Sequence, residues 1–188
     1  VADLIVNSGE DFVLTKLTAN IFMDPGSNIT TITVNYYDNS SGYPSSIIGS
    51  ETLVPSSHTY LGNAYGYDIN EVVLNVTPFN FSGQNGSDST YWIGLTNSVT
   101  TSGGLSYWEI NDISVFGEQY YTNSSGSWTN YHAGADCVYE FEGNCTSLIN
   151  AGCMDSLAYN YDPLADTSDG SCCYVSGCID PIANNYDP

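Results

Sequence analysis

The feature that most limits the fold of this chain is a series of short segments rich in β-branched and aromatic residues, with clusters of turn-forming residues between them. Four such segments lie at residues 31–37, 71–76, 90–96 and 137–142. The Gly-, Asn- and Ser-rich clusters that separate them lie at residues 38–42, 82–86, 101–104 and 123–126. No stretch shows the apolar period of a helix. The pattern therefore predicts an all-β fold, an antiparallel β-sandwich over residues 1–145.

Alternation within the last of these segments separates two kinds of side chain. Cys137, Tyr139 and Phe141 share one face of the predicted strand, and Glu140 and Glu142 share the other. A pair of carboxylates is also the catalytic machinery of most glycosidases. Alternating carboxylates on a solvent-facing strand are commoner, and we interpret the two glutamates in that way.

The composition changes after Asn144, where a repeat begins. Residues 152–163 recur as residues 177–188, with an offset of 25 residues and eight identical positions out of twelve. Periodicity of this kind is typical of repeat arrays. We assign residues 146–188 to a Cys/Asp/Asn-rich tail, with a first copy at 152–176 and a truncated second copy at the end of the chain. Because the second copy stops within the motif, we expect the natural chain to continue.

The tail resembles the Gly-Cys-x-Asp-x-x-Ala-x-Asn-Tyr-Asp-Pro…Asp-Gly-Ser-Cys repeats of large secreted and surface proteins of bacteria, and its first copy carries every motif position. Residues 1–145 resemble the jelly-roll domains common in the same class of protein. The fragments that carry this second resemblance lie at residues 34–38, 42–44, 90–94 and 141–143. The two resemblances imply a jelly-roll-like sandwich with a structural or adhesive role.

The charge balance restricts the partners of the chain. It holds 21 acidic residues and a single basic one, Lys16, which gives a formal net charge of −20. Such a surface repels phosphate, so we expect neither nucleic acid nor an anionic membrane as a partner. We also expect no membrane insertion, because no apolar run approaches the roughly 20 residues that span a bilayer. Cations, calcium above all, are the natural counter-species.

The first repeat concentrates the oxygen ligands that calcium prefers. Its candidate calcium ligands are Asp155, Asn160, Asp162, Asp166 and Asp169. The candidate ligands of a second, incomplete site are Asp180, Asn185 and Asp187. Calcium takes six to eight oxygens, and carboxylates on loops suit it. The alternative is that these residues cap turns, since their spacing is not that of an EF-hand loop.

All six cysteines lie in the last third of the chain, at Cys137, Cys145, Cys153, Cys172, Cys173 and Cys178. Clustered cysteines in a chain rich in Asn, Ser, Thr and Gly indicate an oxidising, extracellular setting. If the chain between the first two is extended, they lie about 26 Å apart, and they cannot pair unless it turns back near Gly143.

A disulfide within the repeat would stabilise a unit that is too small for its own core. Cys153 paired with Cys172, or with its neighbour Cys173, would close one repeat, and Cys178 could pair beyond the observed end. A zinc site is the alternative, but thiolates would have to supply almost all of its ligands, because His58 and His132 lie elsewhere in the sequence.

Surface glycans would keep a lysine-poor protein soluble. Seven Asn-x-Ser/Thr sequons occur, at Asn28, Asn39, Asn75, Asn80, Asn85, Asn123 and Asn144. Two Asp-Ser-x sites that resemble those of bacterial O-glycosylation lie at Ser89 and Ser156. The alternative is that these residues merely reflect a turn-rich composition.

The aromatic residues allow a sugar-binding interpretation. Trp92, Trp108 and Trp128 lie in or near predicted strands, and they could form a stacking platform for carbohydrate. The competing interpretation, which we favour, is that large aromatic side chains fill the core of the sandwich.

No motif of a known catalytic site is present, such as a nucleophile elbow, a zinc-binding His-Glu-x-x-His or a phosphate-binding loop. We therefore expect a structural or adhesive module, not an enzyme, in a long extracellular surface protein. Copies of the chain or neighbouring modules would be its partners, and residues 1–6 could add to a sheet edge in its own or a neighbouring sandwich, giving a head-to-tail filament. The alternative is a carbohydrate-binding module of a secreted hydrolase.

Overall fold

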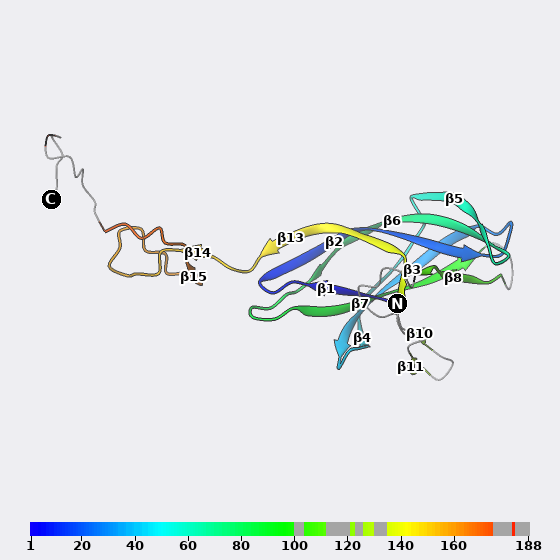
Figure 1. Ribbon diagram of the computed structural model, residues 1–188, viewed down its shortest axis with the longest axis horizontal. Coiled ribbons are helices and arrows are strands. Elements are labelled where there is room, and N and C mark those ends of the chain that lie inside the picture. The colour runs from blue at the N-terminus through cyan, green and yellow to red at the C-terminus, as the bar shows by residue number, and fades with distance from the viewer. Residues whose placement is uncertain (100–103, 112–120, 123–125, 130–134, 175–181, 183–188) are drawn as a thin grey trace. The chain divides into compact units, whose positions relative to one another are not determined.

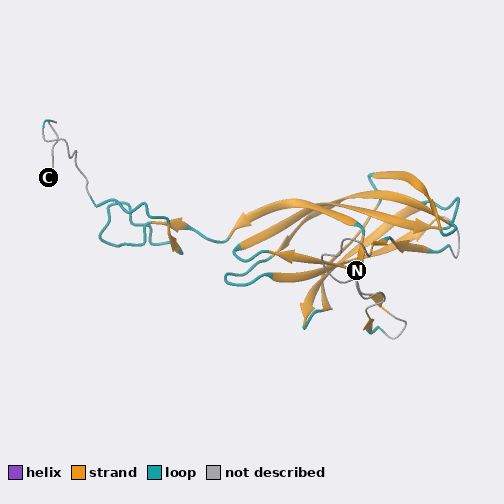
Figure 2. Cartoon of the chain, viewed as in Figure 1, coloured by secondary structure: helices purple, strands orange, loops and turns teal. Residues whose placement is uncertain are grey.

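The computed structural model describes residues 1–99, 104–111, 121–122, 126–129, 135–174 and 182 (Figure 1). The chain divides into two compact units, Val1–Thr146 and Ser147–Pro188. Each unit is described by itself. Every regular element in the described part is a strand or an isolated bridge, as Figure 2 shows, and the expected all-β fold is confirmed.

The first unit is built from two antiparallel sheets that face each other. The strands of the first, called sheet A, lie in the order β1 (Ala2–Val6), β7 (Ser89–Val99), β3 (Ile29–Ser40) and β4 (Tyr43–Leu53). The strands of the second, called sheet B, lie in the order β13 (Tyr139–Ser147), β2 (Glu10–Met23), β6 (Tyr67–Phe81) and β5 (Ser57–Ala64). A short strand, β8 (Ser106–Trp108), also pairs with β2. The curled antiparallel sheets are consistent with the predicted jelly-roll-like β-sandwich.

Three small strand pairs complete the described structure. Two are antiparallel, β9 (Ile110–Asn111) with β12 (Asp136–Cys137) and β10 (Tyr121–Thr122) with β11 (Trp128–Thr129). The third, β14 (Ala151–Gly152) with β15 (Thr167–Ser168), is parallel and belongs to the second unit.

The core forms between the sheets, because every second side chain of a strand points inward. From sheet A, β3 contributes Ile32, Val34 and Tyr36, all of them buried. The Tyr36 ring packs against Phe79 and Phe81 of sheet B, with ring centroids 4.2 Å and 5.5 Å away. Each such buried side chain contributes about 1.5–3 kcal/mol to the free energy of unfolding.

Three of the four predicted strand segments lie within β3, β6 and β7, and the fourth spans β12 and β13. The predicted faces of the last segment also hold. Tyr139 and Phe141 stack with centroids 4.3 Å apart, and Phe141 packs against the core, whereas Glu140 is exposed.

The first strand is paired within its own sandwich. β1 runs antiparallel to β7, with Ala2 opposite Ile93 and Val6 opposite Ser89. Ala2 and Val6 are both buried. Of the two placements expected for this segment, the structure shows the one in its own sheet.

We expect Phe81→Ala to lower the free energy of unfolding of the sandwich by about 3–5 kcal/mol, because Phe81 is fully buried and its loss leaves a cavity. Denaturant unfolding followed by circular dichroism measures this change. The exposed Gln84→Ala is the control, with an expected effect within about 0.5 kcal/mol. Equal effects of the two variants would contradict the described core.

Candidate functional site: the disulfide-closed repeat

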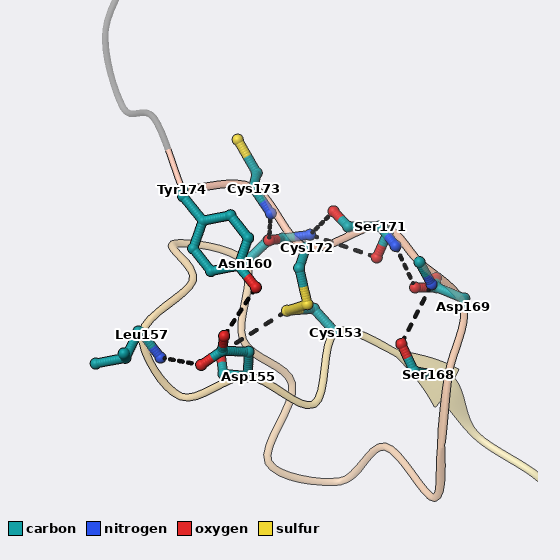
Figure 3. The surroundings of a disulfide bond; sticks show 11 residues. Cys153, Asp155, Leu157, Asn160, Ser168, Asp169, Ser171, Cys172, Cys173 and Tyr174 are labelled. Atoms are coloured by element: carbon teal, nitrogen blue, oxygen red, sulfur yellow. Dashed lines mark hydrogen bonds between the residues drawn. A yellow bond between two sulfur atoms is a disulfide. The ribbon is translucent and has the colours of Figure 1, made fainter. Parts of the chain in front are cut away.

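The second unit holds the first repeat copy, which a disulfide closes. Cys153 and Cys172 are joined across 19 residues, with their Cα atoms 4.8 Å apart (Figure 3). The predicted pairing of Cys153 is thereby confirmed, with Cys172 and not Cys173 as the partner. Cys153 is only 1% exposed, so the disulfide takes the place of a core in this small unit.

The repeated glycine allows two parts of the loop to approach closely. A Cβ atom on Gly152 would lie 3.2 Å from the Cβ atoms of both Asp162 and Ala165. This contact is tighter than ordinary van der Waals packing. The loop is held in the same place by a hydrogen bond from the Asp162 amide to the Cys153 carbonyl, at 2.9 Å. Glycine at this position therefore serves the fold of the repeat.

Three of the four candidate aspartates of the repeat accept hydrogen bonds from backbone amides two residues further along the chain. The Asp155 carboxylate accepts from the Leu157 amide at 2.9 Å, and Asp162 accepts from the Leu164 amide at 2.9 Å. Asp169 accepts from the Ser171 amide at 2.8 Å. Figure 3 shows the bonds of Asp155 and Asp169. These are Asx turns, in which the side chain takes the place of a backbone acceptor.

Asn160 connects the two ends of the repeat beside the disulfide. Its side-chain oxygen accepts a hydrogen bond from the Cys173 amide at 2.7 Å, and its NH2 group donates to the Ser171 carbonyl at 2.8 Å (Figure 3). On the same side of the loop, the Tyr174 hydroxyl donates to the second oxygen of Asp155 at 2.8 Å. Asp155, Asn160 and Asp169 thus surround the closing segment 171–174.

Asn150 forms hydrogen bonds with the other two candidate calcium ligands, Asp162 and Asp166. Its side-chain NH2 group donates to Asp162 at 3.1 Å, and its backbone amide donates to Asp166 at 3.2 Å. The Asp166 amide donates in return to the Asn150 carbonyl at 2.8 Å. Sequence reasoning did not identify Asn150, because it precedes the repeated motif. The five candidates therefore fall into two groups, held by different partners.

These hydrogen bonds favour the ionised carboxylates. The pKa of Asp155 is lowered by the bonds from the Leu157 amide and the Tyr174 hydroxyl. The pKa of Asp169 is lowered by hydrogen bonds from the Ser171 side chain and backbone. The bond to Asp155 also raises the pKa of Tyr174.

No group of three or more His, Cys, Asp or Glu side chains within the described ranges is placed to hold a metal ion. The repeat aspartates are engaged by their own backbone. A carboxylate offers about four lone-pair sites, so these bonds leave acceptor capacity in each of them. Calcium binding at the repeat stays a prediction, and Asp180, Asn185 and Asp187 lie outside the described residues.

The other cysteines lie in different surroundings. Cys137 is buried in β12 with its Sγ atom 3.7 Å from the Val1 carbonyl oxygen, and burial raises the pKa of its thiol to about 12. Cys145 is exposed on β13, which continues through Gly143 without turning back. Cys173 is exposed, and Cys178 lies outside the described residues.

Most of the predicted glycosylation sites are at the surface. The exposed ones are Asn28, Asn75, Asn80, Asn85, Asn144 and Ser156. Asn39 is partly buried and accepts a hydrogen bond from Trp92, and Ser89 is partly buried at the start of β7. Asn123 lies outside the described residues. Glycosylation stays a prediction at all of these positions.

The three tryptophans differ in role. Trp92 is 4% exposed and donates its indole N–H to Asn39 at 3.0 Å. Trp108 packs against the core and donates to the Val138 carbonyl at 2.9 Å. Trp128 is partly exposed and packs against Tyr37, with ring centroids 5.3 Å apart and planes at 87°. Trp92 and Trp108 are thus structural residues, whereas Trp128 belongs to the surface.

Glu142 forms a salt bridge with Lys16, the single basic residue of the sequence. The hydrogen bond from Lys16 to Glu142 raises the pKa of the ammonium group. Glu140, on the same strand as Glu142, is exposed. His58 is exposed on β5, and His132 lies outside the described residues.

Comparison of the chain with protein-family models, curated proteins and solved structures gives no match. In the part of the chain that the structure describes, no helix is long and apolar enough to cross a membrane.

We expect acid to loosen the repeat. The pKa values of Asp155 and Asp169 are lower in the folded chain than in the unfolded one, so their contribution to stability is present above the ordinary Asp pKa of about 4. It is lost as the pH falls through the folded values. Amide exchange followed by nuclear magnetic resonance should show the Leu157 and Ser171 amides losing protection below about pH 4. If both amides keep their protection at a pH where the two carboxylates are fully protonated, the carboxylates do not stabilise the repeat in this way.

Proposed function

We propose that the chain is a structural module of a long extracellular surface protein. The observation that supports this proposal best is what the repeated residues do. In the first copy, Gly152 permits a close approach and Cys153 forms the disulfide. Asp155, Asn160 and Asp162 hold the loop by hydrogen bonds to backbone amides.

Residues repeated for ligand binding alone would be expected to converge on one point and leave all their polar atoms free. Here the repeated polar side chains are instead engaged within the repeat itself. Repeat units that must stack or follow one another need a reproducible shape, and this motif supplies one. A disulfide in so small a unit also supports an oxidising, extracellular setting.

The surface that we propose for assembly lies on the edge strands β4 and β5 and the segment that joins them. β4 is one of the two edge strands of sheet A, and β5 is one of the two edge strands of sheet B. Large apolar side chains are exposed at intervals along this edge, and those that we propose for the contact, together called the edge patch, are Ile47, Ile48, Val54, Tyr60 and Leu61. Val54 is 73% exposed and Leu61 is 51% exposed. Edge strands with exposed apolar side chains favour pairing with another chain.

A second copy of the chain is the partner that we propose for the edge patch. Since β1 is already paired with β7, the contact does not require the first strand to be exchanged. Two modules of net charge −20 repel each other, so assembly should strengthen when salt or calcium screens the charge. A contact between unlike surfaces of successive copies would propagate as a filament.

Assembly is tested with the full chain by light scattering and electron microscopy at low salt, at high salt, and with calcium or a chelator. We expect ordered assemblies that increase with ionic strength or calcium and that Leu61→Glu abolishes. Gln84→Glu adds the same charge at an exposed position outside the edge patch, and it should assemble normally. Monomers under every condition, or equal loss in both variants, would refute the proposal.

Calcium stabilisation of the repeat is the second part of this proposal. The observation in its favour is the density of carboxylates in a chain with one lysine, which calcium would screen. Calorimetric titration should show binding, and Asp162→Asn with Asp166→Asn should weaken it. The melting temperature of the full chain should rise when calcium is added and fall when a chelator removes it. If calcium produces neither heat of binding nor a change in melting temperature, the aspartates only form turns.

A further inference from the structure

A polar pocket with an aromatic wall lies on the outer face of sheet A. Its lining residues come from β3, β7, β11 and the start of the chain: Val1, Asn35, Tyr37, Gly94, Leu95, Thr96 and Trp128. We propose that this pocket binds a neutral carbohydrate ring. The proposal goes beyond the structural role, which does not require any small-molecule ligand.

The register of the sheet creates the floor of the pocket. Asn35 of β3 lies opposite Gly94 of β7, and the neighbouring pair is Tyr37 with Trp92. A Cβ atom on Gly94 would lie 2.8 Å from the Val1 side chain and 3.1 Å from the Tyr37 ring. Glycine therefore leaves room on this face, where any other residue would press against these two side chains.

The wall of the pocket is the edge-to-face pair of Tyr37 and Trp128, whose planes lie at 87°. Both side chains are partly exposed, and neither belongs to the core between the sheets. Rings that are held by each other and reached by solvent offer an apolar surface to the C–H face of a sugar. Trp92 and Trp108 cannot take this role, because Trp92 is buried and Trp108 packs against the core.

Polar groups beside the wall are available for sugar hydroxyls. The side-chain oxygen of Asn35 accepts a hydrogen bond from Ser50 at 2.7 Å, which fixes the amide and leaves its NH2 group as a donor. Among the described residues, this NH2 group, the Tyr37 hydroxyl and the exposed Thr96 hydroxyl have no hydrogen-bond partner. An apolar wall with a few fixed polar groups is the usual composition of a small-molecule site.

Charge and size define the class of ligand. None of the seven lining side chains is charged, and the net charge of −20 repels anionic sugars such as uronic acids and sulfated glycans. The pocket volume is about 190 Å³. This is below the roughly 300–1,000 Å³ of pockets that enclose larger ligands, so one ring or a chain end fits best.

Two sources could supply such a sugar, namely foreign polysaccharide and a glycan carried by another copy of the chain. The first arm of the test uses full-length, non-glycosylated chain on an array of neutral and anionic glycans, followed by calorimetric titration of the neutral oligosaccharides that bind. The second arm asks whether natively glycosylated chain competes for the same pocket and whether enzymatic deglycosylation removes the competition.

Three variants probe the pocket. Trp128→Ala should weaken binding by at least about tenfold through loss of the aromatic wall. Asn35→Asp keeps the acceptor for Ser50 but removes the NH2 donor, and Thr96→Val removes a hydroxyl at equal volume. Each should weaken binding by about fivefold. Tyr159→Ala, which removes an exposed aromatic ring in the repeat, is the control and should bind normally.

Circular dichroism melting of every variant shows whether the sandwich is intact. A change in tryptophan fluorescence on binding that is absent in Trp128→Ala gives a second readout. The proposal is overturned if the intact chain binds no neutral glycan or prefers anionic ones. It is equally overturned if folded Trp128→Ala and Asn35→Asp bind as tightly as the unmodified chain, or if Tyr159→Ala weakens binding as much as they do.

Discussion

A chain with one lysine and 21 acidic residues cannot stabilise itself by networks of ion pairs. Lys16 forms a salt bridge with Glu142, and no other lysine or arginine exists to repeat it. Stability must then come from apolar burial, backbone hydrogen bonds and the disulfide. The large unit uses the first two, through the packed inner faces of its two sheets. Among its described residues, the small unit has few buried apolar side chains, and it relies on backbone hydrogen bonds and the disulfide.

The same constraint explains how the acidic residues of the repeat are used. Without cationic partners, a carboxylate can be satisfied only by water, by metal ions or by neutral donors. In the repeat, the donors are backbone amides together with the Tyr174 hydroxyl and the Asn150 side-chain NH2 group. Each Asx turn fixes a bend of the loop while stabilising a negative charge. Asparagine at position 160 serves where both a donor and an acceptor are needed.

Strands with one regular inward face were predictable from the sequence. In β3, alternation places Ile32, Val34 and Tyr36 in the core without interruption. β2 was not predicted, although it lies at the centre of sheet B. Its buried residues Leu14 and Leu17 are three apart, because the register shifts between Leu14 and Lys16. A bulge of this kind breaks the two-residue period that identifies a strand.

Strands β4 and β5 and the surface sites were harder to predict for a different reason. β5 has no buried face, so its sequence carries no alternation. The repeat disulfide was predictable from the size of the unit and the position of its cysteines. The roles of the tryptophans were not, because they depend on which strand lies alongside. Trp92 is covered beside Tyr37 and Asn39, whereas Trp128 reaches Tyr37 from a separate hairpin.

The position of Lys16 has a consequence for the resistance of the protein to proteases. Trypsin-like proteases cut after lysine or arginine, and this chain offers them one peptide bond, between Lys16 and Leu17. That bond lies in β2, with β13 on one side and β6 on the other, and Leu17 is fully buried. A protease must bind several residues of extended, unpaired chain, so cleavage has to wait until the sandwich opens. For this class of proteases, resistance to digestion is therefore set by the unfolding of the sandwich itself.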